Sequence, residues 1–274
     1  MKRLLKADIY RVLKSRLTLI ALILVLAFPV LVVALYLGIR AISGLGADMD
    51  ELDFLINANS IIGSSYSLTN NIGLVLPSFA GILVCLDISN GTLRNKIIAG
   101  NRRTEIYLSH LIVSILFSAI MITIYAAMTA GLALLFFPFK TSPSQNLAAE
   151  LLYFIVTGTM SFIFIATVST MLAMTLRSVA PTIIFTIVVS IVLMAVTSVL
   201  LMIDYQPYRY AVYLIPTFTG NFFNLNSFSL TGLLTEGAET SRGLMFAEGI
   251  LSYLFFGVLN TVIGLLLFKK RDIN

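Results

Sequence analysis

The side chains best suited to binding another protein lie in a short polar stretch between two apolar runs. Leu93, Ile97 and Ile98 recur there at the spacing of one helical face, and Arg94 and Lys96 lie between them. A simple membrane anchor would need the positive charge but no apolar face. The combination therefore favours a small docking helix that contacts a partner protein.

The residues around this stretch predict where the docking helix begins and ends. Asn90 is suited to cap its start, and Gly100 is suited to end it in a left-handed conformation. Arg102 and Arg103 follow directly and extend the positive charge. We expect a helix of about two turns that projects from the membrane on its cytoplasmic side.

Residue patterns for catalysis and metal binding are missing. A Gly-Lys dipeptide occurs nowhere, so the phosphate-binding loop of P-loop ATPases is excluded. With one histidine, His110, and one cysteine, Cys85, the chain cannot assemble an ordinary zinc site. We interpret His110 as an interfacial histidine held by hydrogen bonds. We expect no catalytic residue, no cofactor and no metal ion bound by this chain.

The polar groups inside the apolar runs are mostly hydroxyls and small residues. The simpler interpretation is close helix packing, and the alternative is a weakly polar transport pathway lined by Thr157, Ser161, Thr197 and Asn260. No ionisable residue lies near the middle of any run. Because proton relays in membranes usually need such residues, a proton-coupled carrier is disfavoured.

The helices that must position these groups are predicted from hydropathy. The chain has 274 residues, 58% hydrophobic and 11% charged, with a mean hydropathy of +0.98. A membrane-spanning helix needs about 20 apolar residues at ~1.5 Å per residue. The sequence therefore predicts an all-α integral membrane protein, a single transmembrane domain over residues 1–274. Its six transmembrane helices fall at about 17–39, 69–88, 106–137, 148–176, 180–203 and 247–268.

The distribution of basic residues predicts the orientation of these spans. With six spans, 14 of the 18 Lys and Arg residues fall on one side, together with only four acidic residues. Lys and Arg gather on the cytoplasmic side of membrane proteins. Both termini are therefore predicted to be cytoplasmic, and the net charge of +5 needs no nucleic-acid partner.

Two further segments are predicted outside the spans. Leu5, Ile9, Val12 and Leu13 share a helical face within residues 2–16, among basic residues, which is typical of an amphipathic helix at the membrane interface. Residues 204–246 are too apolar for a free loop and too interrupted for a span. We expect re-entrant outer helices there, before the last span.

The docking stretch resembles a motif in the permease subunits of ABC-2-type transporters, especially small bacterial ones that pair with a separate ATPase. The similarity covers about 23 residues, and the six spans, the basic amphipathic start and the long outer segment agree with the layout of that family. The motif reads Asp87…Gly91-Thr92-Leu93-Arg94-Asn95-Lys96-Ile97-Ile98…Gly100…Arg103…Ile106-Tyr107-Leu108-Ser109.

The resemblance implies a function and partners. The loop would carry the coupling helix that seats in a groove on an ABC ATPase, and that partner ATPase would use ATP and Mg²⁺. A second permease subunit, a copy or a paralogue, would complete the pathway, and re-entrant helices near Pro216 would line its exit. The implied docking residues are Gly91, Leu93, Arg94, Lys96, Ile97, Ile98, Arg102 and Arg103.

The sequence-based hypothesis is therefore a non-enzymatic permease in the bacterial cytoplasmic membrane. It would export a hydrophobic or amphipathic substrate, such as a peptide, an antibiotic or a drug. Two alternatives remain: a secondary carrier or channel that is not coupled to ATP, and a membrane scaffold or sensor subunit that transports nothing. An ABC ATPase encoded by a neighbouring gene would favour the ATP-driven exporter over both alternatives.

Overall fold

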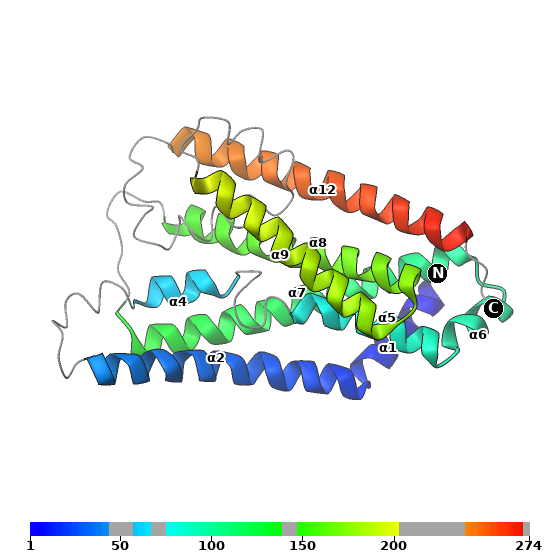
Figure 1. The fold of residues 1–274 in the computed structure, drawn as a ribbon, viewed down its shortest axis with the longest axis horizontal. Coiled ribbons are helices and arrows are strands. Elements are labelled where there is room, and N and C mark those ends of the chain that lie inside the picture. The colour runs from blue at the N-terminus through cyan, green and yellow to red at the C-terminus, as the bar shows by residue number, and fades with distance from the viewer. Residues whose placement is uncertain (44–56, 67–74, 139–146, 203–238, 271–274) are drawn as a thin grey trace.

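The computed structural model describes residues 1–43, 57–66, 75–138, 147–202 and 239–270 (Figure 1). Every regular element in these ranges is an α-helix, which confirms the all-α prediction. The long helices run side by side along the longest axis of the molecule (Figure 1). Five are long and apolar enough to cross a membrane: α2 (Arg16–Ser43), α7 (Arg103–Phe136), α8 (Leu147–Leu176), α9 (Val179–Met202) and α12 (Glu239–Lys270).

The expected second span differs from the other five. Its described part is α5 (Leu76–Ser89), 14 residues or about 21 Å of helix, which is shorter than the ~30 Å hydrocarbon layer. α5 is followed by α6 (Thr92–Ile98), and the two are bent by 63°. Residues 69–74, the start of the predicted span, lie outside the described residues.

Some helix ends depart from the hydropathy prediction. α12 begins at Glu239, although its membrane-spanning part begins at Phe246, next to the predicted start at residue 247, and α7 begins at Arg103 rather than near residue 106. Helices continue through polar residues at their ends, which a count of apolar residues does not register. Residues 204–238, with the predicted re-entrant helices and Pro216, lie outside the described part of the chain.

The core is centred on α8, which contacts α5, α7, α9 and α12. Glycines allow close approaches at two further places, between α8 and Tyr66 and between α12 and α7. A Cβ atom added at Gly158 would lie 2.5 Å from the Tyr66 ring, and one at Gly264 would overlap the Tyr107 hydroxyl and lie 2.8 Å from its Cζ atom. At these two glycines, the packing interpretation of the small residues is correct.

The N-terminal segment forms a helix separate from the first span. α1 (Lys2–Leu13) ends just before Ser15, whose Oγ atom accepts a hydrogen bond from the Thr18 amide at 3.1 Å. This side chain caps the start of α2. The Thr18 hydroxyl also donates to the carbonyl oxygen of Val12 at 2.5 Å, so the junction between α1 and α2 is tied from both sides.

Candidate functional site

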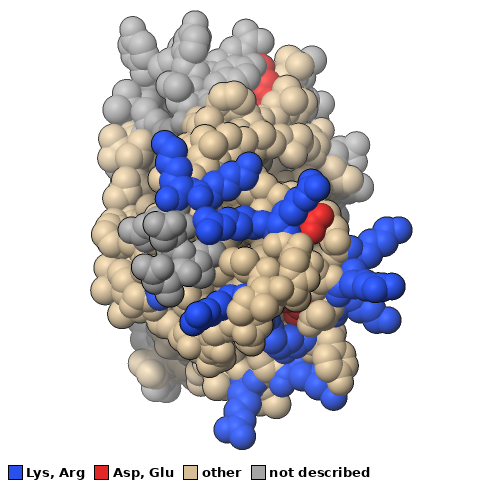
Figure 2. Space-filling model, turned by 90° about the vertical axis from the view of Figure 1, so that its right-hand side faces the viewer, with Lys and Arg blue, Asp and Glu red and all other residues tan. Residues whose placement is uncertain are grey.

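One end of the molecule carries α1, α6, the start of α7 and the end of α12 (Figure 1). Viewed from that end, Lys and Arg side chains spread over the surface and far outnumber the visible Asp and Glu (Figure 2). The exposed cations of these elements are Lys2, Arg3, Lys6, Arg94, Arg102, Lys269 and Lys270. A short helix that projects from a cationic surface is the arrangement expected for the docking element.

The predicted docking helix is present, but its start differs from the prediction. Asn90 does not cap α6, because α5 continues to Ser89 and Asn90 ends that helix. Gly91 instead occupies the N-cap position just before α6, with a φ of 68°. Gly100 has a φ of 84°, so its left-handed conformation after α6 is as predicted. Left-handed backbone at both positions favours glycine, and the two residues set the directions in which the chain enters and leaves α6.

The apolar residues of α6 point in different directions. Leu93 is 4% exposed and packs in a cluster with residues of α5, α7, α8 and α12, and Ile97 packs against the edge of that cluster. Ile98 is 75% exposed. Arg94 and Asn95 are also exposed. The outward surface of α6 therefore consists of two polar side chains and one large apolar side chain.

The flanking cations of the docking stretch have separate environments. Arg102 is exposed, whereas Arg103 donates a hydrogen bond to the carbonyl oxygen of Lys269 at 3.1 Å. That bond joins the start of α7 to the end of α12. Docking roles for these residues stay predictions, and Arg102 is the more accessible of the two.

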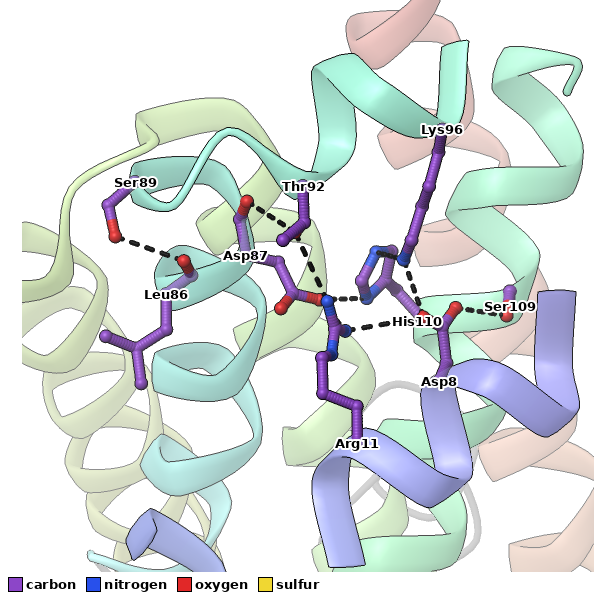
Figure 3. A network of polar contacts seen from close by, with 9 residues as sticks. All are labelled: Asp8, Arg11, Leu86, Asp87, Ser89, Thr92, Lys96, Ser109 and His110. Carbon is purple, nitrogen blue, oxygen red and sulfur yellow. Dashed lines mark hydrogen bonds and ion pairs between the residues drawn. The ribbon is translucent and has the colours of Figure 1, made fainter. Parts of the chain in front are cut away.

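Lys96 points inward, into a buried polar network (Figure 3). Its Nζ atom lies 2.6 Å from Oδ1 of Asp8 in α1 and 3.1 Å from Nε2 of His110 in α7. The other carboxylate oxygen of Asp8 accepts a hydrogen bond from Ser109 at 2.7 Å. This part of the network joins α1, α6 and α7, and it confirms that His110 is hydrogen-bonded.

A second set of contacts extends the network to α5 (Figure 3). Arg11 pairs with the carboxylate of Asp87, and it also lies 3.3 Å from Oδ1 of Asp8. The guanidinium donates to the Thr92 hydroxyl at 3.2 Å, and that hydroxyl donates to the carbonyl oxygen of Asp87 at 2.8 Å. Thr92 therefore holds the bend between α5 and α6, and Arg11 connects that bend to α1.

The charges of the network balance. Asp8 and Asp87 are buried carboxylates, and Lys96 and Arg11 supply two positive charges beside them. Burial by itself would raise the pKa of Asp8, but the hydrogen bonds from Lys96 and Ser109 and the nearby positive charge lower it below its ordinary value of 3.8. Asp8 is therefore ionised at neutral pH and paired with Lys96.

The same residues have spacings that a metal site could use. Ligand atoms of Asp8, Asp87 and His110 lie within 4.8 Å of one another. Lys96 and Arg11 already neutralise the two carboxylates, however, and a divalent cation would add uncompensated positive charge to a buried site. The arrangement favours an ion-pair network over a metal centre, and the expectation of no bound metal stays a prediction.

Three of the four predicted pathway residues are buried, and the fourth, Asn260, is half-buried. Thr157 and Thr197 donate to backbone carbonyls of their own helices, and both are 0% exposed. Ser161 lies 2.5 Å from the Tyr253 hydroxyl, and Asn260 donates to Thr167 at 3.0 Å. The last two contacts join α8 to α12. The structure thus places two of the four residues at one helix interface, and the pathway role stays a prediction.

An apolar groove of about 280 Å³ lies beside that interface, between α7, α8 and α12. Ile115, Met160, Phe164 and Val258 are among its lining residues, and its hydroxyl-bearing residues are Thr167, Tyr253 and Thr261. Two predicted pathway residues contact its lining: Asn260 through Thr167, and Ser161 through Tyr253. The groove can hold an apolar chain or ring.

Sequence reasoning missed the role of Asp8. It treated α1 as an apolar face among cations, and Leu5, Ile9 and Val12 do pack in the core, whereas Leu13 is 69% exposed. The available clue was a lone acidic residue on the same helical face as Leu5 and Val12, at a spacing of three and four residues. Its partners Lys96 and Ser109 could not be identified from the sequence, because they come from two other helices.

Comparisons with known proteins do not identify a family. No protein-family model matches the chain, and no curated protein matches it. The resemblance to ABC-2-type permeases therefore rests on the motif around α6 and on the layout of the helices.

Proposed function

We propose that this protein is the membrane subunit of an ATP-driven exporter and that α6 is its docking site for a separate ABC ATPase. In this proposal the α5–α6 pair supplies the sixth span, and both termini and α6 face the cytoplasm. The protein lies in the bacterial cytoplasmic membrane and pairs with a second permease subunit. Nucleotide hydrolysis belongs to the partner, because the chain has no phosphate-binding loop.

The observation that carries the proposal is the two-sided character of α6. Its inner side is held by Leu93 and Lys96, and its outer side presents Arg94 and Ile98. A seven-residue helix without tertiary support would not be stable in water. A short helix that buried contacts fix to the bundle, and that ends in an exposed apolar residue, can bind a partner and transmit its movement to the bundle.

The groove between α7, α8 and α12 supports the expected substrate class. Its lining is almost entirely apolar, and its polar side-chain groups are the hydroxyls of Thr167, Tyr253 and Thr261. Such a surface suits a hydrophobic or amphipathic molecule, for example a peptide or a drug-like compound. ATP-driven export then requires that the substrate bind the inward-facing and outward-facing states with different affinities.

Co-purification with the ATPase tests the proposal. Variants Arg94→Glu and Ile98→Asp change only the outer side of α6, whereas changes at Leu93 or Lys96 would also disturb packing. We expect both outer variants to insert into the membrane normally and to lose the ATPase. Lys270→Glu, at the same end but on α12, is the matched control and should keep it. Retention of the ATPase by both outer variants would refute the docking assignment.

A further inference from the structure

We propose that Asp8 is a positioning residue: through Lys96 it fastens the N-terminal helix α1 to α6, so that the two helices move as one unit. The link between α1 and α6 is formed within this chain and does not depend on a bound ATPase. What it transmits rests on the proposed function, in which α6 receives the motion of an ATPase.

The connection between α1 and α6 depends on side chains. The backbone of α6 packs against α5 and α7, whereas α1 packs against α7. Among the described residues, two polar side-chain contacts bridge from α1 to α6: Asp8 to Lys96 at 2.6 Å and Arg11 to Thr92 at 3.2 Å. Of these, the first is an ion pair whose side chains are 2% and 13% exposed, so water screens it little.

α1 is in turn coupled to a membrane-spanning helix. Ser15 caps α2, and Thr18 of α2 bonds back to the carbonyl oxygen of Val12 in α1. α2 packs along α7 over the length of the bundle. A rotation of α6 would therefore pass through Lys96 and Asp8 to α1 and on to the first span, a route separate from the direct chain connections of α6 to α5 and α7.

Stability alone does not account for this arrangement. Buried ion pairs are often no more stabilising than apolar residues of similar volume, because desolvation offsets the attraction between the charges. A buried ion pair can instead select one arrangement of the surrounding helices over alternative ones. Asp8 fits this description, because Lys96 of α6 and Ser109 of α7 donate hydrogen bonds to its two different carboxylate oxygens.

The first experiment measures the link without any ATPase. Nitroxide labels are placed on the exposed positions Lys6→Cys in α1 and Asn95→Cys in α6, and their separation is measured by double electron–electron resonance in lipid nanodiscs. Cys85 is buried and should stay unlabelled. We expect one narrow distance in the parent protein, a broad distribution in Asp8→Asn and in Lys96→Met, and a narrow one again in the Asp8→Lys/Lys96→Asp exchange.

A matched control separates the link from general damage. Arg94→Gln removes an exposed cation from the same helix and should leave the distance narrow. If Asp8→Asn and Lys96→Met also give the narrow parental distance, the link is refuted. If a single variant does not fold, the charge exchange decides: a narrow distance supports the link, and a broad one overturns it.

The second experiment measures transmission, with the ATPase reconstituted beside the permease. We expect Asp8→Asn to bind the ATPase as the parent does but to lower permease-stimulated ATP hydrolysis roughly tenfold, and we expect the charge exchange to recover part of it. Unchanged stimulation in Asp8→Asn would overturn the transmitting role. If the parent protein binds no ATPase, the proposed function fails, while the distance measurement still decides the link.

Discussion

The Nζ atom of Lys96 lies 2.6 Å from Oδ1 of Asp8, although 88 residues separate the two in the chain. The pair joins the amphipathic N-terminal helix to the short helix that projects from the end of the bundle. Because the carboxylate of Asp8 is buried, each partner depends on the other for its charge to be tolerated. Several expectations follow from that dependence.

Removing one charge of this pair should cost more stability than removing both. Lys96→Met leaves Asp8 buried and without its ammonium partner, and we expect a loss of about 3–5 kcal/mol. The double variant Asp8→Asn/Lys96→Met should recover much of that loss, since no unpaired charge remains. A double-mutant cycle on unfolding in detergent micelles measures both values. Additive losses would show that the two side chains are energetically independent.

The link between α1 and α6 should be insensitive to pH near neutrality. Because the pKa of Asp8 is lowered in the folded protein, its ionised form stabilises that state above pH 3.8 and the contribution is lost as the pH falls through the lowered value. The spin-label distance should therefore stay narrow from about pH 8 to about pH 5 and broaden only well below pH 4. His110, Arg11 and Asp87 also face this site, and a broadening between pH 7 and 5 would identify His110 or Asp87 as the controlling group, because the Arg11 guanidinium stays charged throughout this range.

Gly264 should tolerate no side chain, unlike another glycine of the same helix. A Cβ atom at Gly264 would overlap the Tyr107 hydroxyl, a buried group, so Gly264→Ala should lower stability by about 1–3 kcal/mol. Gly257 has nothing within 4 Å of the same position. Gly257→Ala is the matched control and should be neutral or slightly stabilising. Thermal unfolding compares the two, and equal midpoints would contradict the close approach of α7 and α12.

The hydroxyl contacts between α8 and α12 should act on stability only weakly. Tyr253→Phe removes the 2.5 Å contact with Ser161, which still donates to the carbonyl oxygen of Thr157 at 3.0 Å. Interhelical hydrogen bonds in membranes average about 0.6 kcal/mol, so we expect a loss of that order. Unchanged transport in this variant indicates a packing role for Ser161. A changed substrate preference at unchanged stability would instead favour the pathway role.

The orientation of the bundle should be detectable by chemical labelling. Asn95→Cys, exposed on α6, should react with a membrane-impermeant maleimide in inverted vesicles but not in intact cells. Asp50→Cys lies between the predicted spans 17–39 and 69–88, on the outer side in the six-span topology, and it should show the opposite reactivity. Labelling of position 95 from outside intact cells would invert the topology and remove the basis for ATPase docking.

Sequence periodicity and hydropathy predicted much of the architecture. Apolar runs long enough to cross a membrane correspond to α2, α7, α8, α9 and α12. The helical spacing of Leu93, Ile97 and Ile98 predicted a short helix where α6 lies. These features are local: they depend on neighbours within about four residues along the chain. Helix ends were less well predicted, because polar residues continue a helix without changing its hydropathy pattern.

The partners of the charged residues were decided only by tertiary structure. Lys96 was predicted to face outward with Arg94, and which of the two turns inward depends on the presence of Asp8 across the gap to α1. The sequence by itself determined that this chain forms apolar helices with a cationic end. Tertiary packing decided which cations remain on the surface, because a buried charge needs an opposite charge beside it in the folded protein. The sequence separation of two charged residues does not show whether they form such a pair.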